Sequence, residues 1–193
     1  MKIAAAHRIL AVAGICAAAL VGLVISEAYA RDGGQEITLP MAAVDPRALL
    51  SGHYVQLNFT DQLEPDEVCP EAGDWEWVSL RREGDIYVAA GGAMSRDLAQ
   101  SVGSLPVKGT YTCQPPTPAS GGVEGMIGWV TLDLGVDRFH INQADAMRIE
   151  EVLRDQRAAQ DTRAFAILSV GRDGRARMRA LVIDGERFDL SWL

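Results

Sequence analysis

The sequence predicts a mainly β fold, in which an N-terminal membrane helix precedes one antiparallel-sheet domain with a single packed helix. Three observations lead to this prediction. Two Asp-Gly steps, Asp173-Gly174 and Asp184-Gly185, each separate two strand-like runs, which is a strong hairpin signal. Many segments after residue 35 alternate apolar and polar side chains, as half-buried strands do. Only residues 142–159 place apolar side chains at clear helical spacing in this part of the chain.

The first element is an uninterrupted apolar run, Ile9 to Ile25, which follows a basic N-terminal flank. As a helix it is about 25 Å long, which suits a membrane-spanning segment. The basic flank favours the cytoplasm, so we expect a single-pass protein of the bacterial inner membrane with its C-terminal domain in the periplasm. The alternative is cleavage after Ala30, because Ala28-Tyr29-Ala30 has the A-x-A pattern of a signal peptide.

Composition divides the chain into a signal-anchor or signal peptide at 1–30, a polar tether at 31–35 and a domain at 36–193. The chain has 18 basic and 26 acidic residues. Lys2, Arg8 and Glu27 precede residue 31, which leaves 16 and 25 and a net charge of −9. Binding to nucleic acid needs basic residues that replace phosphate counterions, so we expect no nucleic-acid partner.

Strand-like runs in the domain are bounded by Gly, Pro, Asn and Asp, which are turn residues. In chain order, we expect strands at 36–40, 53–59, 75–80, 86–90, 105–113, 126–134, 136–141, 165–170, 175–183 and 187–190. Gly84 supplies the turn of the hairpin between the third and fourth strands. Residues 61–74 and 114–125 are rich in Pro, Gly and charge, and we expect surface loops there.

The expected helix begins at Asn142, a residue type that caps helices, with Asp145 three positions later in an arrangement like a capping box. Its apolar stripe consists of Ala146, Ile149, Val152 and Leu153. The helix should end near Ala159 and pack one face against the sheet.

Residues 44–59 read V-D-P-R-A-L-L-S-G-H-Y-V-Q-L-N-F, a turn followed by a strand. This segment resembles the signature of the GDYXXLXY family, a set of bacterial membrane-anchored proteins without an assigned activity. The pattern Gly-Asp-Tyr-x-x-Leu-x-Tyr falls on Gly52, His53, Tyr54, Leu57 and Phe59. The preceding D-P-R of the signature falls on Asp45, Pro46 and Arg47.

Two positions depart from the family pattern, since His53 stands where Asp is usual and Phe59 where Tyr is usual. The resemblance extends over nearly everything after residue 34. We interpret the signature as mostly specifying the fold, with Val55, Leu57 and Phe59 on the buried face of the strand. Asp45 and Arg47 are candidates for a salt bridge or a cap in the turn.

The resemblance also implies a function and a partner. It favours retention of residues 9–25 as an anchor in the inner membrane. Genes of the family often lie beside genes for multi-spanning membrane proteins, which implies an accessory domain that acts with such a protein. The alternatives are an envelope hydrolase with an unrecognised site and a cleaved, soluble periplasmic binding module.

No motif assigns a catalytic, cofactor-binding or metal-binding residue, so we expect no enzyme and no cofactor. A membrane-tethered serine–lysine peptidase would carry its nucleophile where this chain has Ala43, and Lys108 is the only lysine of the domain. His53 and His140 are the only histidines beyond the apolar run, too few for a metal site, which needs three or four converging ligands.

Cys69 and Cys113 are the only cysteines outside the apolar run. They either pair, as an oxidising periplasm permits, or stay as two free thiols.

The segment 172–179 contains four arginines, three of which alternate along an expected strand: Arg172, Arg175, Arg177 and Arg179. They either face anionic lipid headgroups or an acidic partner, or pair with carboxylates of the domain itself. Regular alternation would place Leu181 and Ile183 on the same face as the arginines, so we expect this face to pass from solvent into the core.

Overall fold

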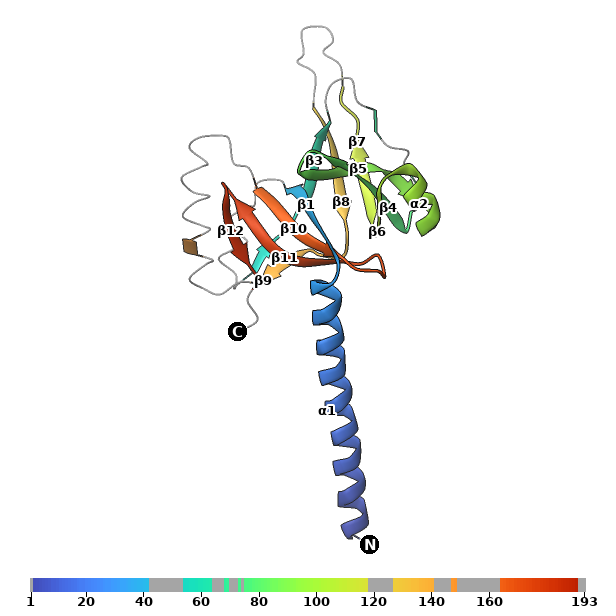
Figure 1. Ribbon diagram of the computed structural model, residues 1–193, viewed down its shortest axis with the longest axis vertical. Coiled ribbons are helices and arrows are strands. Elements are labelled where there is room, and N and C mark those ends of the chain that lie inside the picture. The colour runs from blue at the N-terminus through green and yellow to red at the C-terminus, as the bar shows by residue number, and fades with distance from the viewer. Residues whose placement is uncertain are drawn as a thin grey trace.

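The computed structural model describes residues 2–41, 54–63, 68–69, 73, 75–117, 127–140, 147–148 and 164–190. In this part of the chain it contains twelve strands and two helices, and all strand pairs are antiparallel. The predicted mainly β fold with an N-terminal apolar helix is therefore confirmed. Figure 1 shows the long helix extending from a body built of strands.

Helix α1 (Lys2–Asp32) contains the whole apolar run, and its large apolar side chains are exposed. Its length and composition suit a membrane-spanning helix, and a signal sequence near an N-terminus has the same properties. The helix continues past the run, and the N–H of Gly33 donates to the carbonyl of Tyr29 at 2.9 Å. Strand β1 starts at Gln35, so the segment predicted as a tether, 31–35, holds the helix end, two glycines and the first strand residue.

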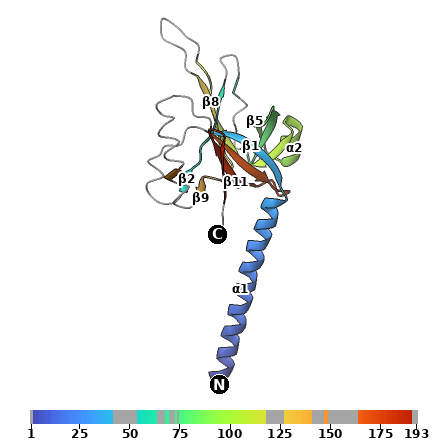
Figure 2. The same ribbon diagram turned by 60° about the vertical axis from the view of Figure 1, so that its left-hand side comes forward.

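The first sheet has the order β1-β10-β11-β12, formed by β1 (Gln35–Met41), β10 (Ala164–Val170), β11 (Ala176–Ile183) and β12 (Glu186–Asp189). Both Asp-Gly steps form hairpin turns in it, as predicted. The first is a three-residue loop closed by the N–H of Gly171, which donates to the carbonyl of Arg175 at 3.0 Å. Figures 1 and 2 both show this loop beside the upper end of α1, and α1 contacts β10 and β11.

A bulge in β11 changes which side chains face the core. Ile167 pairs with Ala180 and Leu168 with Met178, so Arg179 has no partner on β10. An extra residue shifts the alternation of a strand by one position. Met178 before the bulge and Leu181 and Ile183 after it therefore all lie in the core. The prediction that Leu181 and Ile183 share the arginine face was wrong.

The other strands form three smaller sheets. One has the order β5-β4-β6, from β4 (Trp77–Glu83), β5 (Ile86–Ala93) and β6 (Leu105–Lys108). A second has the order β3-β8-β7, from β3 (Phe59–Leu63), β7 (Thr110–Gln114) and β8 (Gly128–Asp133). The third pairs β2 (Tyr54–Gln56) with β9 (Arg138–His140). Gly84, with φ of 62°, lies in the β4–β5 turn as expected.

Two predicted strands are each divided in two. Segment 53–59 divides into β2 and β3, because the chain leaves β9 after Leu57 and joins β8 at Phe59. Segment 105–113 divides at Gly109, whose φ is 156° and whose Cβ position lies 2.4 Å from the carbonyl oxygen of Asp133. A side chain would not fit there, so the chain turns at this glycine. Strand β3 also extends into the predicted loop 61–74, as far as Leu63.

A short helix, α2 (Arg96–Val102), was not predicted. The hydroxyl of Ser95 caps it by accepting from the N–H of Leu98 at 3.4 Å. The buried hydroxyl of Ser79 on β4 donates to the carbonyl of Ala99 at 2.5 Å, which fixes α2 to the sheet. The predicted helix at 142–159 lies outside the described residues except for Met147 and Arg148, whose backbone is helical.

One apolar cluster joins the sheets. Its fully buried members come from the first sheet, from β4 and β6, from β8 and from β9: Ile37, Leu39, Leu168, Leu181, Ile183, Val78, Leu80, Val107, Val130 and Phe139. Burying side chains of this size contributes about 1.5–3 kcal/mol each, so this cluster holds the sheets together and fixes the position of the β10–β11 loop.

Candidate functional site at the junction of helix and domain

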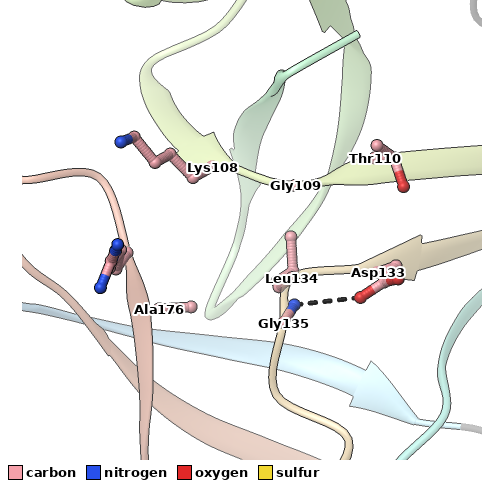
Figure 3. Close-up of a pocket in the computed structure, with 8 residues that line it drawn as sticks. Lys108, Gly109, Thr110, Asp133, Leu134, Gly135 and Ala176 are labelled. Carbon is pink, nitrogen blue, oxygen red and sulfur yellow. Dashed lines mark hydrogen bonds between the residues drawn. The ribbon is translucent and has the colours of Figure 1, made fainter. Parts of the chain in front are cut away.

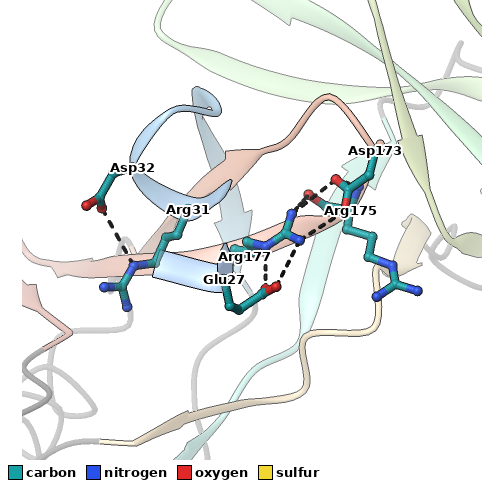
Figure 4. Close-up of polar contacts among 6 residues, drawn as sticks. All are labelled: Glu27, Arg31, Asp32, Asp173, Arg175 and Arg177. Atoms are coloured by element: carbon teal, nitrogen blue, oxygen red, sulfur yellow. Dashed lines mark hydrogen bonds and ion pairs between the residues drawn. The ribbon is translucent and has the colours of Figure 1, made fainter. Parts of the chain in front are cut away.

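An arginine on β11 joins helix α1 to the domain. The Arg177 side chain is 10% exposed. Its Nε and Nη2 donate to the carboxylate of Glu27 on α1, the latter at 3.2 Å. Its Nη1 and Nη2 donate to the carboxylate of Asp173 at 3.1 and 2.9 Å. Figure 4 shows the guanidinium between the two carboxylates. We call these three residues the Arg177 junction.

The Asp173-Gly174 loop positions this junction. Gly174 has φ of 78°, and its Cβ position lies 2.3 Å from the ring of Trp77, so both backbone and space require glycine. The carboxylate of Asp173 also accepts from the N–H of Arg175 at 3.1 Å. The loop is therefore fixed to β4 on one side and to Arg177 on the other.

The charges of the junction stabilise one another. Hydrogen bonding to Arg177 lowers the pKa of Asp173 to about 2, helped by the backbone N–H of Arg175 and opposed by partial burial. The hydrogen bonds from Asp173 and Glu27 raise the pKa of Arg177. The Arg177–Asp173 pair is therefore ionised throughout the physiological pH range.

A pocket of about 430 Å³ lies next to the junction, where β6 turns into β7, β8 ends and β11 begins (Figure 3). Its lining residues are Lys108, Gly109, Thr110, Asp133, Leu134, Gly135, Arg175 and Ala176. The Nζ of Lys108 lies 5.5 Å from the centroid of the Trp77 ring. The Asp133 carboxylate accepts from the N–H of Gly135 at 3.0 Å. The lining thus combines two cations and one carboxylate with small and apolar residues.

The structure joins Cys69 and Cys113 in a disulfide, across a sequence separation of 44 residues. Cys113 belongs to β7 and packs against the core. The bond therefore fastens the described residues 68–69 to the β3-β8-β7 sheet.

The described residues of the family signature are Tyr54, Leu57 and Phe59, and they neither form the junction nor line the pocket. Tyr54 pairs with His140 between β2 and β9. Leu57 and Phe59 are buried in the core, as predicted. The other signature residues, Asp45, Pro46, Arg47, Gly52 and His53, lie outside the described residues, as does the side chain of Val55. The described part of the signature therefore contributes to folding. Among the described residues, no group of three His, Cys, Asp or Glu is placed to hold a metal ion.

Comparison with known proteins identifies the family. The model of the family described as GDYXXLXY protein matches residues 16–181. This chain belongs to the GDYXXLXY family. The match begins inside α1 and includes most of the GDYXXLXY domain, as far as β11. No curated protein matches this GDYXXLXY protein. No solved structure matches it either.

Sequence reasoning identified the arginines of this GDYXXLXY protein but not their arrangement. Of the two alternatives, pairing with carboxylates of the chain holds for Arg177, and for Arg179, which lies 3.2 Å from Glu36. The contact between Glu27 and Arg177 was not predicted, although Glu27 is the first charged residue after the apolar run. The pocket was not predicted either. The one feature of the sequence that pointed to it was Lys108, the only lysine of the domain.

Proposed function

We propose that this protein is a single-pass inner-membrane protein whose β domain, on the periplasmic side, acts as an accessory to a multi-spanning membrane protein. The observation that carries this proposal is the Arg177 junction. Glu27 lies on α1, two residues beyond the apolar run, and is bonded to a strand of the domain. A cleaved signal peptide has no reason to contribute a charge to the folded domain.

The backbone around the A-x-A pattern supports retention of the helix. Ala28, Tyr29 and Ala30 lie within α1, and the Tyr29 carbonyl accepts from the N–H of Gly33. A peptidase reaches such a segment only after local unfolding. Cleavage after Ala30 would also remove Glu27 from Arg177.

The exposed surface of α1 supports a partner within the membrane. Gly14, Ala18 and Gly22 follow one another at four-residue spacing and therefore share one face of the helix. A Cβ on Gly14 or Gly22 would meet no atom within 4 Å. Small residues at this spacing let transmembrane helices approach closely. A protein with several transmembrane helices suits this face, in agreement with the partner that the family resemblance implies.

The test of the anchor is the intact mass and the location of the full chain in bacterial cells. We expect the uncleaved mass, in a membrane fraction that detergent releases and high salt does not. Protease added to spheroplasts should digest the domain. A soluble periplasmic product that begins at Arg31 would contradict the anchor.

The test of the partner is photo-crosslinking in cells from two positions on α1. A crosslinker at Ala18 lies on the small-residue face, and one at Leu20 lies on roughly the opposite face. We expect Ala18 to capture a multi-spanning membrane protein and Leu20 to capture it much less. Capture of chaperones alone, or equal capture from both positions, would overturn the partner while leaving the anchor unaffected.

A further inference from the structure

The cations of this acidic domain fall into two groups. Twelve lysine and arginine residues of positions 31–193 are described, and eight of them lie within ion-pair distance of a carboxylate. No described carboxylate lies at that distance from the other four. These four, which we call the basic corner, are Arg96, Lys108, Arg172 and Arg175.

The basic corner is assembled from three separate elements around one loop. Arg172 and Arg175 flank Asp173-Gly174 in the β10–β11 loop. The Nη1 of Arg96, on α2, donates to the carbonyl of Arg172 at 2.8 Å. The backbone N–H of Lys108, at the end of β6, donates to the carbonyl of Gly174 at 2.8 Å. Four basic residues without an ion pair to a described carboxylate therefore surround one loop of a domain whose net charge is negative.

The carboxylate of the loop does not neutralise the corner, because Asp173 is bonded to Arg177. Figure 4 shows the Arg175 side chain pointing away from this pair. In the adjoining pocket, the Asp133 carboxylate accepts from the N–H of Gly135. Asp133 stays charged in this arrangement, but neither it nor any other described carboxylate lies within ion-pair distance of Lys108 or Arg175, so these two cations can bind an anion from outside.

The Arg177 junction also sets the level of the corner relative to a membrane. Glu27 lies two residues after Ile25, an advance of about 3 Å along a helix. A headgroup region extends roughly 5–8 Å beyond the hydrocarbon on each side. Because Arg177 contacts both Glu27 and Asp173, the loop lies at the height of the headgroups once α1 crosses a bilayer.

We propose that the basic corner binds the phosphate of an anionic phospholipid headgroup, with Lys108 and Arg175 in the pocket as its direct ligands. Lysine and arginine are the side chains that bind phosphate best, and a volume of about 430 Å³ accommodates a headgroup. The source is a lipid rather than a soluble ester, because the corner is held beside the anchor. This inference rests on the proposed function only in requiring that α1 enter the membrane.

The test uses the full chain in nanodiscs that contain equal amounts of phosphatidylglycerol and phosphatidylcholine. Co-elution of protein and nanodisc reports insertion of α1. After transfer to mild detergent, mass spectrometry measures the ratio of the two lipids that remain bound. We expect enrichment of phosphatidylglycerol in the wild type. Each of Lys108→Gln and Arg175→Gln should reduce it about fivefold, which corresponds to about 1 kcal/mol per basic residue.

The matched control is Arg82→Gln/Arg187→Gln, compared with Lys108→Gln/Arg175→Gln. Both double variants remove two positive charges. Arg82 is five residues along β4 from Trp77, about 17 Å away, and Arg187 pairs with Val182, equally far along β11 from Arg177. The control should keep the wild-type enrichment. Lys108→Gln also removes a contact with the Trp77 ring and could therefore disturb the fold. Arg175→Gln alone controls for this effect, because the Arg175 guanidinium forms no ion pair with a described carboxylate.

Three results would overturn the proposal. The first is equal retention of both lipids by the wild type in nanodiscs that co-elute with it. The second is an equal loss of enrichment in the control variant. The third is complete displacement of the lipid by soluble glycerol phosphate that also binds the chain without lipid, which would make a free phosphate ester the ligand. Failure of the chain to co-elute with nanodiscs would instead overturn the membrane anchor.

Discussion

The two Asp-Gly turns of the C-terminal meander have the same sequence signal and very different surroundings. At Asp184-Gly185, φ is 52° and 83°, and a Cβ on Gly185 would meet no atom within 4 Å. At Gly174, φ is 78°, and the Cβ position lies 2.3 Å from the Trp77 ring. Asp173 binds Arg177, whereas Asp184 makes no ion pair with the described residues.

The difference separates what local sequence determines from what tertiary structure determines. An Asp-Gly step favours a turn because both residues tolerate positive φ. The environment of the turn depends on residues far away, Trp77 in one direction and Glu27 in the other. The same dipeptide therefore forms an isolated hairpin end in one place and part of the junction between α1 and the domain in the other.

The largest expected effect comes from adding a methyl group to each glycine. Gly185→Ala adds backbone strain alone, about 1 kcal/mol of lost stability. Gly174→Ala adds the same strain and an overlap with Trp77, so we expect a loss of about 2–4 kcal/mol. Urea unfolding of the full chain in detergent, followed by tryptophan fluorescence, measures both. Equal losses of stability in the two variants would contradict this prediction, because they would show that the Trp77 ring moves aside at no energetic cost.

A smaller effect is expected from neutralising the aspartates. The pKa of Asp173 is lowered from 3.8 to about 2, so its ion pair stabilises the fold above about pH 4, and this contribution disappears as pH falls through about 2. Because Asp173 is partly exposed, we expect Asp173→Asn to cost roughly 0.2–1 kcal/mol at pH 7, less as pH approaches about 2, and nothing well below that pH. Denaturant unfolding at several pH values measures the difference.

The control for this prediction is Asp184→Asn, which removes a carboxylate from the other turn. We expect it to change the free energy of unfolding at pH 7 by less than about 0.5 kcal/mol. In Arg177→Gln, substitution of Asp173 should also lose its effect, because the partner is gone. A full effect of Asp173→Asn in that background would assign the stabilisation to the Arg175 N–H instead.

The smallest effect is expected on the strand that leads into the first turn. Ser169 pairs with Arg177 across β10 and β11, and its buried hydroxyl has no hydrogen-bond partner. We expect Ser169→Ala to change stability by no more than about 0.5 kcal/mol. The matched variant is Ser79→Ala, whose buried hydroxyl donates to the Ala99 carbonyl and whose loss should cost about 1 kcal/mol. Thermal unfolding of both variants provides the comparison.

Most hairpins and the apolar helix were predictable, because turn residues and apolar runs are local signals. The division of 53–59 and of 105–113 was not, since each depends on which distant strand takes over the pairing. The bulge at Arg179 likewise arises from pairing with β10. Helix α2 is seven residues long, with one capping serine, too short to give a clear periodic pattern.

The candidate site was less predictable than the fold. Glu27 and Arg177 are 150 residues apart, and no local pattern links them. The arginines of 172–179 were visible as a group, but their division into paired and unpaired members depends on which carboxylates the fold brings near. Lys108 was visible as an isolated lysine, while its neighbours Gly174 and Arg175 come from the distant β10–β11 loop.

If α1 spans a bilayer as we propose, its unbroken course into the Arg177 junction determines how the domain is oriented on the membrane. The apolar run is about 25 Å long, shorter than an average hydrocarbon thickness of about 30 Å. A short membrane-spanning segment is accommodated by local thinning of the bilayer. Tilting accommodates only segments that are longer than the hydrocarbon thickness, so it does not apply here. An untilted α1 that is bonded to β11 would hold the first sheet at one fixed angle to the membrane plane. Thinner membranes would accommodate this arrangement with the least deformation of the bilayer.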